Sequence, residues 1–207
     1  MGRHAILICG LVLSTTRLFP WSCMAANAVP PSLPTRVDVT DCGAVADGVT
    51  DSLPAIQQAL NQVQAAGGGV VFFPASEKPY LVRGTIQVRG SGTVLSGTGA
   101  TIKLADGAAN GTRQQRTTAS QVHVIHIAGT PQEPVRNVQL LGLAIDANIY
   151  QQADYYNPRA VVAEYASRLL VRDVKIVRAF VGLDFGAGSS HCEARDCVIE
   201  DWTEDAF

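Results

Sequence analysis

The chain has 207 residues, of which 47% are hydrophobic and 16% are charged. This composition excludes a disordered tail and a coiled coil, and the length suits one compact domain. The formal net charge is −2, with 16 Lys and Arg residues against 18 Asp and Glu residues. Since non-specific nucleic-acid binding needs a basic surface, we expect no nucleic-acid partner.

The first 28 residues are typical of a secretion signal. A short positive start with Arg3 precedes a mostly apolar run at 5–15, and the triplet Ala-Asn-Ala at 26–28 matches the cleavage pattern. A retained membrane anchor is the alternative, but the run is shorter than the ~18 apolar residues that indicate a membrane-spanning helix. We predict a signal peptide at 1–28 and a secreted protein, extracellular or periplasmic, with no membrane partner after signal removal.

Only one segment has the pattern of an amphipathic helix. Residues 29–36 are rich in proline and are expected to form an extended leader, after which the domain begins with a short strand at 37. Asp51 is the predicted N-cap of the helix, and the glycine triplet at 67–69 is its predicted end. The expected apolar face comprises Leu53, Ile56, Leu60 and Val63. Such a helix covers an apolar surface on one side only.

After this helix the sequence is typical of an all-β fold. Short apolar runs are separated by Gly, Asn, Asp and Ser, and no second helical pattern follows. Three of these segments, at 137–145, 168–176 and 191–199, repeat one another. In each repeat two pairs of apolar residues flank a central residue, which is Gly142, Asp173 or Asp196.

The central residue of each repeat is predicted to be a corner. Across it the apolar alternation slips by one position, and in a straight strand this slip would turn the second pair outward. Gly and Asp tolerate left-handed backbone angles, so a corner lets both pairs face one interior. The repeats therefore predict a parallel β-solenoid with coils ~4.8 Å apart. Equivalent residues form inward columns, one of Val138, Leu169 and Cys192 and another of Leu143, Val174 and Cys197.

Three cysteines remain after signal removal, which are Cys42, Cys192 and Cys197. The last two occupy inward columns, which favours small buried side chains with inert thiols. A metal site is the alternative for their spacing, but zinc would need two more ligands. We therefore predict no metal site.

The start of the predicted domain resembles a known family. Gly43-Ala44, Asp47-Gly48 and Thr50-Asp51 precede the helix, while the run from Gly67 to Pro74 and Tyr80 follow it. This spacing is similar to the opening of the pectate-lyase superfamily, more narrowly its rhamnogalacturonase and epimerase-like branch. The resemblance implies a right-handed parallel β-helix with an N-terminal capping helix over residues 37–207. Asp47 and Asp51 are read as a turn residue and a helix cap, not as catalytic carboxylates.

The resemblance also implies action on a polysaccharide, in the first place hydrolysis of pectic polymers such as rhamnogalacturonan or polygalacturonan. Glycoside hydrolysis uses two carboxyl groups about 5–9.5 Å apart, a separation that neighbouring coils provide. The segment 203–207 is similar to the second acidic motif of the related polygalacturonases, so Asp205 and Glu204 are the candidate catalytic residues. In the first motif Asp184 matches, but Val181 stands where the family has a catalytic Asp. Solvated turn residues are the alternative for the acidic pair.

Five residues are candidates for substrate binding by the same resemblance. Asp146 and Asn148 match an Asp-Gly-Asn step that follows a strand in the family, and Tyr155 lies on the loop after it, where an exposed ring suits sugar stacking. The alternative for that loop is packing on its own side chains. Arg178 and Asp184 complete the set.

Two other functions remain open. A polysaccharide lyase or uronan epimerase would abstract a proton next to the uronate carboxyl, with Ca²⁺ as cofactor and Arg178 as the candidate base; a hydrolase implies no cofactor. A non-catalytic glycan-binding protein, adhesin-like or tailspike-like, is the third class, which Val181 favours and the signal peptide disfavours for a tailspike. We also expect the 207 residues to be the N-terminal part of a longer protein and to be inactive alone.

Overall fold

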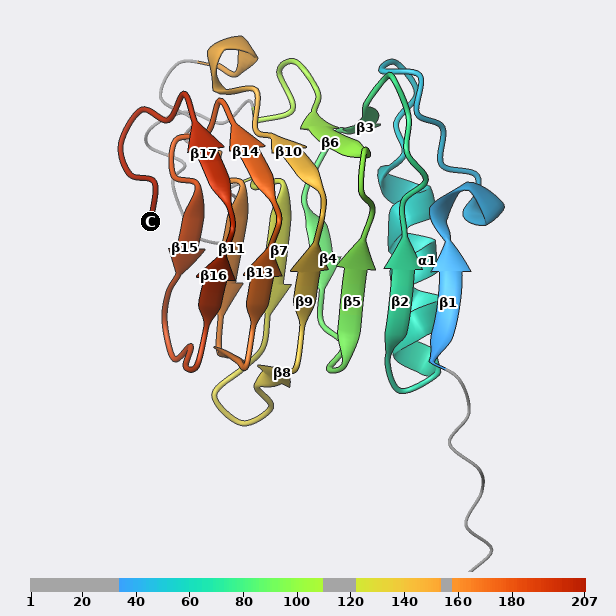
Figure 1. The fold of residues 1–207 in the computed structure, drawn as a ribbon, viewed down its shortest axis with the longest axis vertical. Coiled ribbons are helices and arrows are strands. Elements are labelled where there is room, and N and C mark those ends of the chain that lie inside the picture. The colour runs from blue at the N-terminus through green and yellow to red at the C-terminus, as the bar shows by residue number, and fades with distance from the viewer. Residues whose placement is uncertain (1–33, 110–121, 154–157) are drawn as a thin grey trace, which may run out of the picture. The chain divides into compact units, whose positions relative to one another are not determined.

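The computed structural model describes residues 34–109, 122–153 and 158–207. Within these ranges every strand pair is parallel, and the chain winds as a right-handed parallel β-helix, as predicted (Figure 1). The predicted signal peptide and most of the predicted leader lie outside the described residues. The first strand begins at Thr35, slightly before the predicted start of the domain at residue 37.

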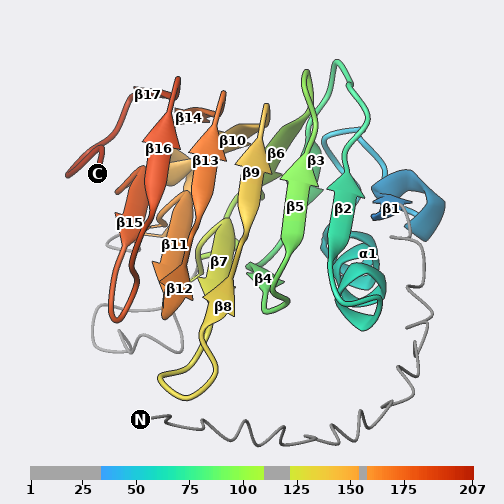
Figure 2. The ribbon, with the colours of Figure 1, turned by 60° about the horizontal axis from the view of Figure 1, so that its bottom comes forward.

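Three parallel sheets form the walls of the helix (Figure 2). The first sheet has the order β1-β2-β5-β9-β13-β16, and the second has the order β17-β14-β10-β6-β3. The first contains β1 (Thr35–Asp38), β2 (Gly69–Phe72), β5 (Thr93–Ser96), β9 (Gln139–Leu141), β13 (Leu170–Arg172) and β16 (Glu193–Arg195). The second contains β3 (Tyr80–Val82), β6 (Thr101–Leu104), β10 (Ala144–Asp146), β14 (Lys175–Val177) and β17 (Val198–Glu200).

The third sheet has the order β15-β11-β7-β4, and a two-stranded ladder of β12 and β8 lies beside these walls. The third sheet contains β4 (Ile86–Val88), β7 (Ile125–Ala128), β11 (Val161–Glu164) and β15 (Leu183–Phe185). The ladder contains β8 (Val135–Arg136) and β12 (Ala166–Ser167). The described residues also form two short 3-10 helices, η1 (Val39–Cys42) and η3 (Ile149–Gln151), and one α-helix.

Left-handed backbone angles mark the corners between strands. The predicted corners at Gly142, Asp173 and Asp196 have φ of 68°, 55° and 52°, so the explanation for the slip in apolar alternation is confirmed. Two further columns of corners were not predicted. They are Asn137, Arg168 and His191 before the first sheet, and Asn148, Arg178 and Asp201 after the second.

The inward columns are confirmed by strand register and burial. Leu170 pairs with both Gln139 and Glu193, which places Leu169 between Val138 and Cys192 in the stack. Leu169 and Val138 are fully buried, whereas Cys192 and Cys197 are half-buried and pack against the same core. Both thiols are free, and desolvation by burial raises the pKa of Cys192. This environment is that of a packed side chain rather than a reactive thiol.

The predicted helix is α1 (Leu53–Ala65), which packs on β1, β2, β4 and β5 (Figure 2). Its buried residues include the predicted Ile56, Leu60 and Val63. The predicted N-cap, Asp51, was wrong. The N-cap is Ser52, and the helix begins at the next residue, Leu53. Asp51 precedes this cap, and its Oδ1 accepts the N–H groups of Leu53 and Arg83, both at 3.1 Å. The Asp51 carboxylate therefore joins the start of the helix to the end of β3.

Two other residues of the opening motif also shape the backbone. The Asp47 carboxylate accepts the N–H groups of Val49 and Thr50 at 2.8 and 2.7 Å and the Thr50 hydroxyl at 2.7 Å. Gly69 has φ of 148°, and a Cβ there would lie 2.2 Å from the carbonyl oxygen of Thr35. The close pairing of β1 with β2 thus requires glycine at this position.

Candidate functional site

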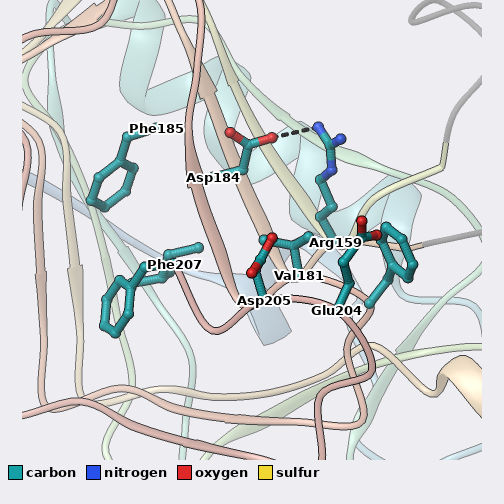
Figure 3. Close-up of a pocket in the computed structure, with 9 residues that line it drawn as sticks. Arg159, Val181, Asp184, Phe185, Glu204, Asp205 and Phe207 are labelled. Atoms are coloured by element: carbon teal, nitrogen blue, oxygen red, sulfur yellow. Dashed lines mark hydrogen bonds and ion pairs between the residues drawn. The ribbon is translucent and has the colours of Figure 1, made fainter.

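An open hollow of about 400 Å³ lies where β15 meets the segment after β17 (Figure 3). Phe185 and Phe207 lie on one side of it, while Arg159 and Glu204 lie on the other. The lining residues are Arg159, Phe180, Val181, Leu183, Asp184, Phe185, Glu204, Asp205 and Phe207. The hollow therefore combines aromatic rings with three carboxylates and one guanidinium, a mixture that suits a sugar with a charged substituent.

Backbone pairing places the acidic residues on neighbouring coils. Val181 and Asp205 form a parallel β-bridge, and the Gly182 N–H donates to the Asp205 carbonyl at 3.0 Å. Asp205 is therefore stacked directly on Val181, at the coil spacing of ~4.8 Å. Asp184 lies on β15, three residues after Val181, between Leu183 and Phe185, which pack against the core. The structure thus brings together three of the predicted site residues, Asp184, Glu204 and Asp205.

The three carboxylates differ in their partners. Asp184 forms an ion pair with Arg159, and their side chains are 28% and 32% exposed. Glu204 and Asp205 are exposed, and neither has an ion-pair partner among the described residues. Asp184 is therefore held in place, whereas Glu204 and Asp205 are free to contact a ligand.

Two neighbouring histidines, His123 and His126, lie near Arg159. His123 is buried, and burial lowers its pKa to about 3, with smaller contributions from Arg159 and His126. The His126 Nε2 lies 3.1 Å from a carboxylate oxygen of Glu164. His123 is therefore neutral at physiological pH, and its Nδ1 accepts the backbone N–H of Arg159 at 3.4 Å.

Arg159 and these histidines were not among the predicted site residues. The repeat pattern covers 137–145, 168–176 and 191–199, and Arg159 lies between the first two repeats. Its position follows only from the pairing of Val161 with Leu183, which sets Arg159 beside Val181. The single usable signal was a cation just before an apolar run, which is too common to indicate a site.

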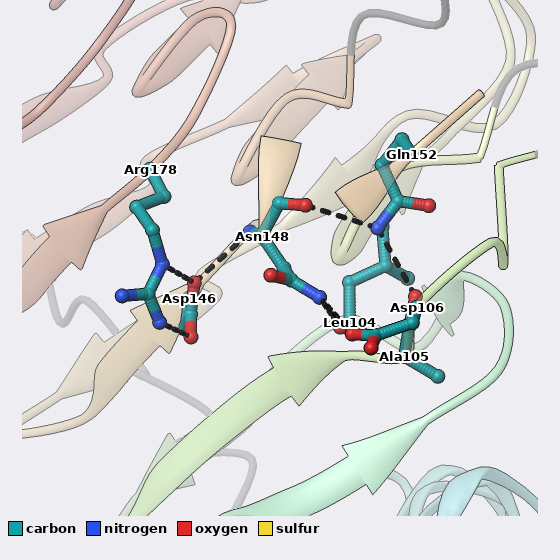
Figure 4. A network of polar contacts seen from close by, with 7 residues as sticks. All are labelled: Leu104, Ala105, Asp106, Asp146, Asn148, Gln152 and Arg178. Atoms are coloured by element: carbon teal, nitrogen blue, oxygen red, sulfur yellow. Dashed lines mark hydrogen bonds and ion pairs between the residues drawn. The ribbon is translucent and has the colours of Figure 1, made fainter. Parts of the chain in front are cut away.

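Three other predicted residues gather in a separate network (Figure 4). Asp146 is 3% exposed, forms an ion pair with Arg178, and accepts the Asn148 N–H at 2.9 Å. The Asn148 side-chain amide donates to the Leu104 carbonyl at 3.0 Å and to Asp106 at 2.8 Å. Asp146 and Asn148 are thus occupied in holding the corner after β10.

This network argues against Arg178 as a base. The hydrogen bond from Arg178 to Asp146 raises the pKa of the guanidinium, so the side chain stays protonated. Its side chain is 41% exposed and reaches solvent beside the network. Arg178 lies two residues before Phe180, which lines the hollow, but Arg178 itself does not line it. Tyr155, the fifth predicted binding residue, lies outside the described residues.

Neither a metal cluster nor a membrane-spanning helix is found in the described ranges. No three His, Cys, Asp or Glu side chains of residues 34–109, 122–153 and 158–207 are grouped to hold a metal ion. Over the same ranges, no helix is long and apolar enough to cross a bilayer.

Relatives were found by sequence and by structure. Mannuronan C5-epimerase AlgE1 of Azotobacter vinelandii is 39% identical over 84 residues, which are 36% of this chain and 6% of the relative. The A-module of the mannuronan C-5 epimerase AlgE6 from the same organism superposes with a TM-score of 0.65 and 26% identity. That match covers 80% of this chain and 44% of the module.

A family 28 exopolygalacturonase of Yersinia enterocolitica has the same fold, with a TM-score of 0.64 and 16% identity. This match covers 82% of the chain and 39% of the enzyme. The chain therefore spans less than half the length of each of these relatives.

The family profile described as rhamnogalacturonase A/epimerase, pectate lyase-like matches residues 36–148, which is more than half of the chain. This range contains the opening motif, α1 and the corner at Asn148, and it ends before the residues that line the hollow. On this match and on the fold, the chain belongs to the rhamnogalacturonase A/epimerase, pectate lyase-like family.

Proposed function

We propose that this protein is a secreted enzyme that binds an acidic polysaccharide in the hollow around Asp184 and modifies it there. The observation that carries the proposal is the meeting of Asp184, Glu204 and Asp205 with Arg159 around one open hollow. A carboxylate that lacks an ion pair can exchange a proton with a substrate, and a guanidinium can bind a uronate carboxylate. Export through residues 1–28 remains part of this proposal.

The first reaction that suits these residues is hydrolysis of a pectic polymer. Asp205 and Glu204 are exposed and supply the two carboxyl groups, one to protonate the leaving oxygen and one to activate water. Asp184 is paired with Arg159, so its role is to position a sugar rather than to transfer a proton. The exposed ring of Phe207 offers aromatic surface for the sugar ring.

Epimerisation at C5 is the second candidate, favoured by the sequence match to the mannuronan C5-epimerase. It begins with removal of the proton next to the uronate carboxyl, and a cation must stabilise the negative charge that develops. In this reaction Arg159 would bind the carboxylate and Asp205 or Glu204 would accept the proton, a proposal supported by the lining of the hollow by all three residues. A lyase shares this first step and differs only in the elimination that follows. If Ca²⁺ takes part, it would supply charge neutralisation at the same carboxylate.

The reactions are separated by incubating the full-length protein with polygalacturonate, rhamnogalacturonan and mannuronan. New reducing ends without unsaturated product indicate hydrolysis, ultraviolet-absorbing unsaturated ends indicate a lyase, and C5 inversion without chain cleavage, seen by NMR, indicates an epimerase. Binding to all three polymers without any turnover would contradict the proposal that the protein is an enzyme and would favour the adhesin-like alternative.

The residue assignment is tested with Asp205→Asn in the same assays. We expect turnover to fall by about 10³-fold, because a general acid or base is lost while the shape of the side chain is kept. The matched control is Asp196→Asn, which changes an exposed corner residue with φ of 52° away from the hollow and should leave turnover unchanged. Unchanged turnover in Asp205→Asn would show that the catalytic assignment is wrong.

A further inference from the structure

The outer face of the first sheet carries a patch of apolar side chains. The central column of this sheet points into the core and is fully buried at Val71, Leu95, Leu140 and Val171. The residues on either side of this column point outward, because side chains alternate along a strand. Five of these outward residues are apolar and half-buried, and they are Val70, Phe72, Val94, Leu141 and Leu170. Figure 1 shows β2, β5 and β9 in front, with α1 behind them. Such a patch on an open wall is typical of an interaction surface.

Strand register arranges the outward residues of this face in two columns that cross six coils. The first column contains Arg36, Val70, Val94, Gln139, Leu170 and Glu193. The second column contains Asp38, Phe72, Ser96, Leu141, Arg172 and Arg195. Each column therefore has a charged residue at both ends and mostly uncharged residues between them.

The two ends of each column carry opposite charges. The first column begins with Arg36 and ends with Glu193, while the second begins with Asp38 and ends with Arg195. Glu193 and Arg195 form an ion pair with each other, and their side chains are 48% and 61% exposed. Asp38 uses only Oδ1 for its hydrogen bonds to Thr40, at 2.9 and 2.6 Å. All four charged groups are thus able to meet the charges of a second molecule.

A second copy of the chain would satisfy this charge pattern. The copy is related by a two-fold axis that lies in the interface, parallel to the strands. This rotation reverses the order of the coils and sets each column opposite the same column of the other copy. Arg36 would then face Glu193 of the partner subunit, and Asp38 would face the partner's Arg195. Because the contact is isologous, each of these ion pairs forms twice.

The same rotation also places apolar residues against each other. Leu170 would pack on Val70 of the partner subunit, and Arg172 would face the partner's Phe72. The Phe72 ring already accepts one guanidinium within its own chain, that of Arg36 at 3.9 Å from the ring centre. A two-fold axis parallel to the stack would also pair opposite charges, but it would set Leu170 against Arg172 of the partner subunit. The axis parallel to the strands therefore fits the apolar residues better.

The size of this face predicts a weak dimer. Six coils extend over about 24 Å of the stack, and strands of this length are about 10–13 Å across. This area is smaller than the roughly 800 Å² that each partner buries in a standard interface. We therefore expect a dissociation constant in the micromolar range or above.

We infer that the outer face of the first sheet is a homodimer interface, in which the coil of Arg36 packs on the coil of Glu193 of the partner subunit. The inference does not depend on the proposed function, because β15 and the hollow belong to the third sheet.

The test is sedimentation velocity of the full-length protein over a series of concentrations, with the variants Arg36→Glu and Glu193→Arg. Each variant sets like charges against each other twice, and we expect each to raise the Kd of dimerisation about tenfold. An equimolar mixture of the two variants restores opposite charges at both contacts. Its Kd should therefore return to within about threefold of the value for the unchanged protein.

Two further variants complete the test. Leu170→Lys sets a charge against Val70 of the partner subunit and should raise the Kd at least as much as either charge reversal. The matched control is Lys175→Glu, which makes the same change of charge as Arg36→Glu on the outer face of the second sheet. The Lys175 side chain is 53% exposed, and the control should leave the Kd unchanged.

Four results would overturn the inference. The first is a protein that stays monomeric into the millimolar range, and the second is a dimer that Leu170→Lys leaves intact. The third is equal weakening by Lys175→Glu and Arg36→Glu, which would reveal a general charge effect. The fourth is a mixture of Arg36→Glu and Glu193→Arg that associates no better than either variant alone, because only the axis parallel to the strands lets the two variants complement each other.

Discussion

The start of the β-helix and the part around the hollow use the same residue types for different purposes. At the start, Asp47 and Asp51 accept backbone N–H groups and are occupied in turn and helix geometry. Around the hollow, Glu204 and Asp205 are exposed and lack ion pairs among the described residues. The family profile covers the first region and not the second. Membership of this family therefore reports a shared fold, and the chemistry must be read from residues beyond the matched range.

The largest expected effect is on stability, and it distinguishes two glycines. Gly69 is required because another strand approaches it closely, whereas Gly67 is favoured only by its backbone angle. Gly69→Ala places a Cβ 2.2 Å from the Thr35 carbonyl oxygen, and we expect it to lower the free energy of unfolding by about 4 kcal/mol, or to prevent folding. Gly67→Ala is the control, because Gly67 has φ of 82° with no atom within 4 Å of a new Cβ. It should cost about 1 kcal/mol.

Urea unfolding of the two glycine variants measures the difference. Equal losses of stability in Gly69→Ala and Gly67→Ala would contradict the close approach of β1 to β2 and with it the structural reading of the glycine triplet.

An intermediate effect should distinguish the ion pair of the network, in which Asp146 is buried, from the pair of the hollow, in which both side chains are partly exposed. Asp146→Ala removes a carboxylate that is only 5% exposed together with its hydrogen bonds to Arg178 and to the Asn148 N–H, and it should cost about 2 kcal/mol of stability. Asp184→Ala breaks a pair that is 28% and 32% exposed, and it should cost about 1 kcal/mol or less.

Turnover should respond in the opposite order, with a greater loss in Asp184→Ala than in Asp146→Ala when both are assayed well below their unfolding temperatures. Thermal unfolding and polysaccharide turnover, measured on the same samples, check both parts. If Asp184→Ala were strongly destabilised while its turnover per folded molecule stayed unchanged, Asp184 would serve the stability of the fold and not the reaction.

The smallest effect is a pH dependence near the start of the β-helix. Hydrogen bonds from Thr50 and Val49 lower the pKa of Asp47 to about 2. Since the folded-state pKa lies below the unfolded value of about 3.9, Asp47 stabilises the fold above about pH 4, and this contribution is lost as the pH falls toward 2. Asp47→Asn should therefore be less stable than the unchanged protein near neutral pH, with a difference that shrinks on acidification. Unfolding midpoints across this range measure it, and a constant difference would contradict the assignment.

The fold was more predictable than the site because its signals are local. The slip in apolar alternation at Gly142, Asp173 and Asp196 predicted corners, since these residue types tolerate left-handed angles. The corners at Arg168 and Arg178 were not predicted, because arginine has no such preference. Asp51 was placed at the correct end of the helix, but its bond to Arg83 joins segments that are distant in sequence.

Composition, alternation and motif spacing were sufficient for a parallel β-helix with one covering helix, because inward and outward positions repeat within a few residues of each other. The grouping of side chains into a hollow and a separate network was decided only by the stacking of coils. The register of β11 with β15 sets Arg159 beside Val181, which in turn pairs with Asp205, and no local pattern encodes that register. The same stacking sets Lys103 and Arg83, which come from neighbouring coils, around one hollow of the second sheet.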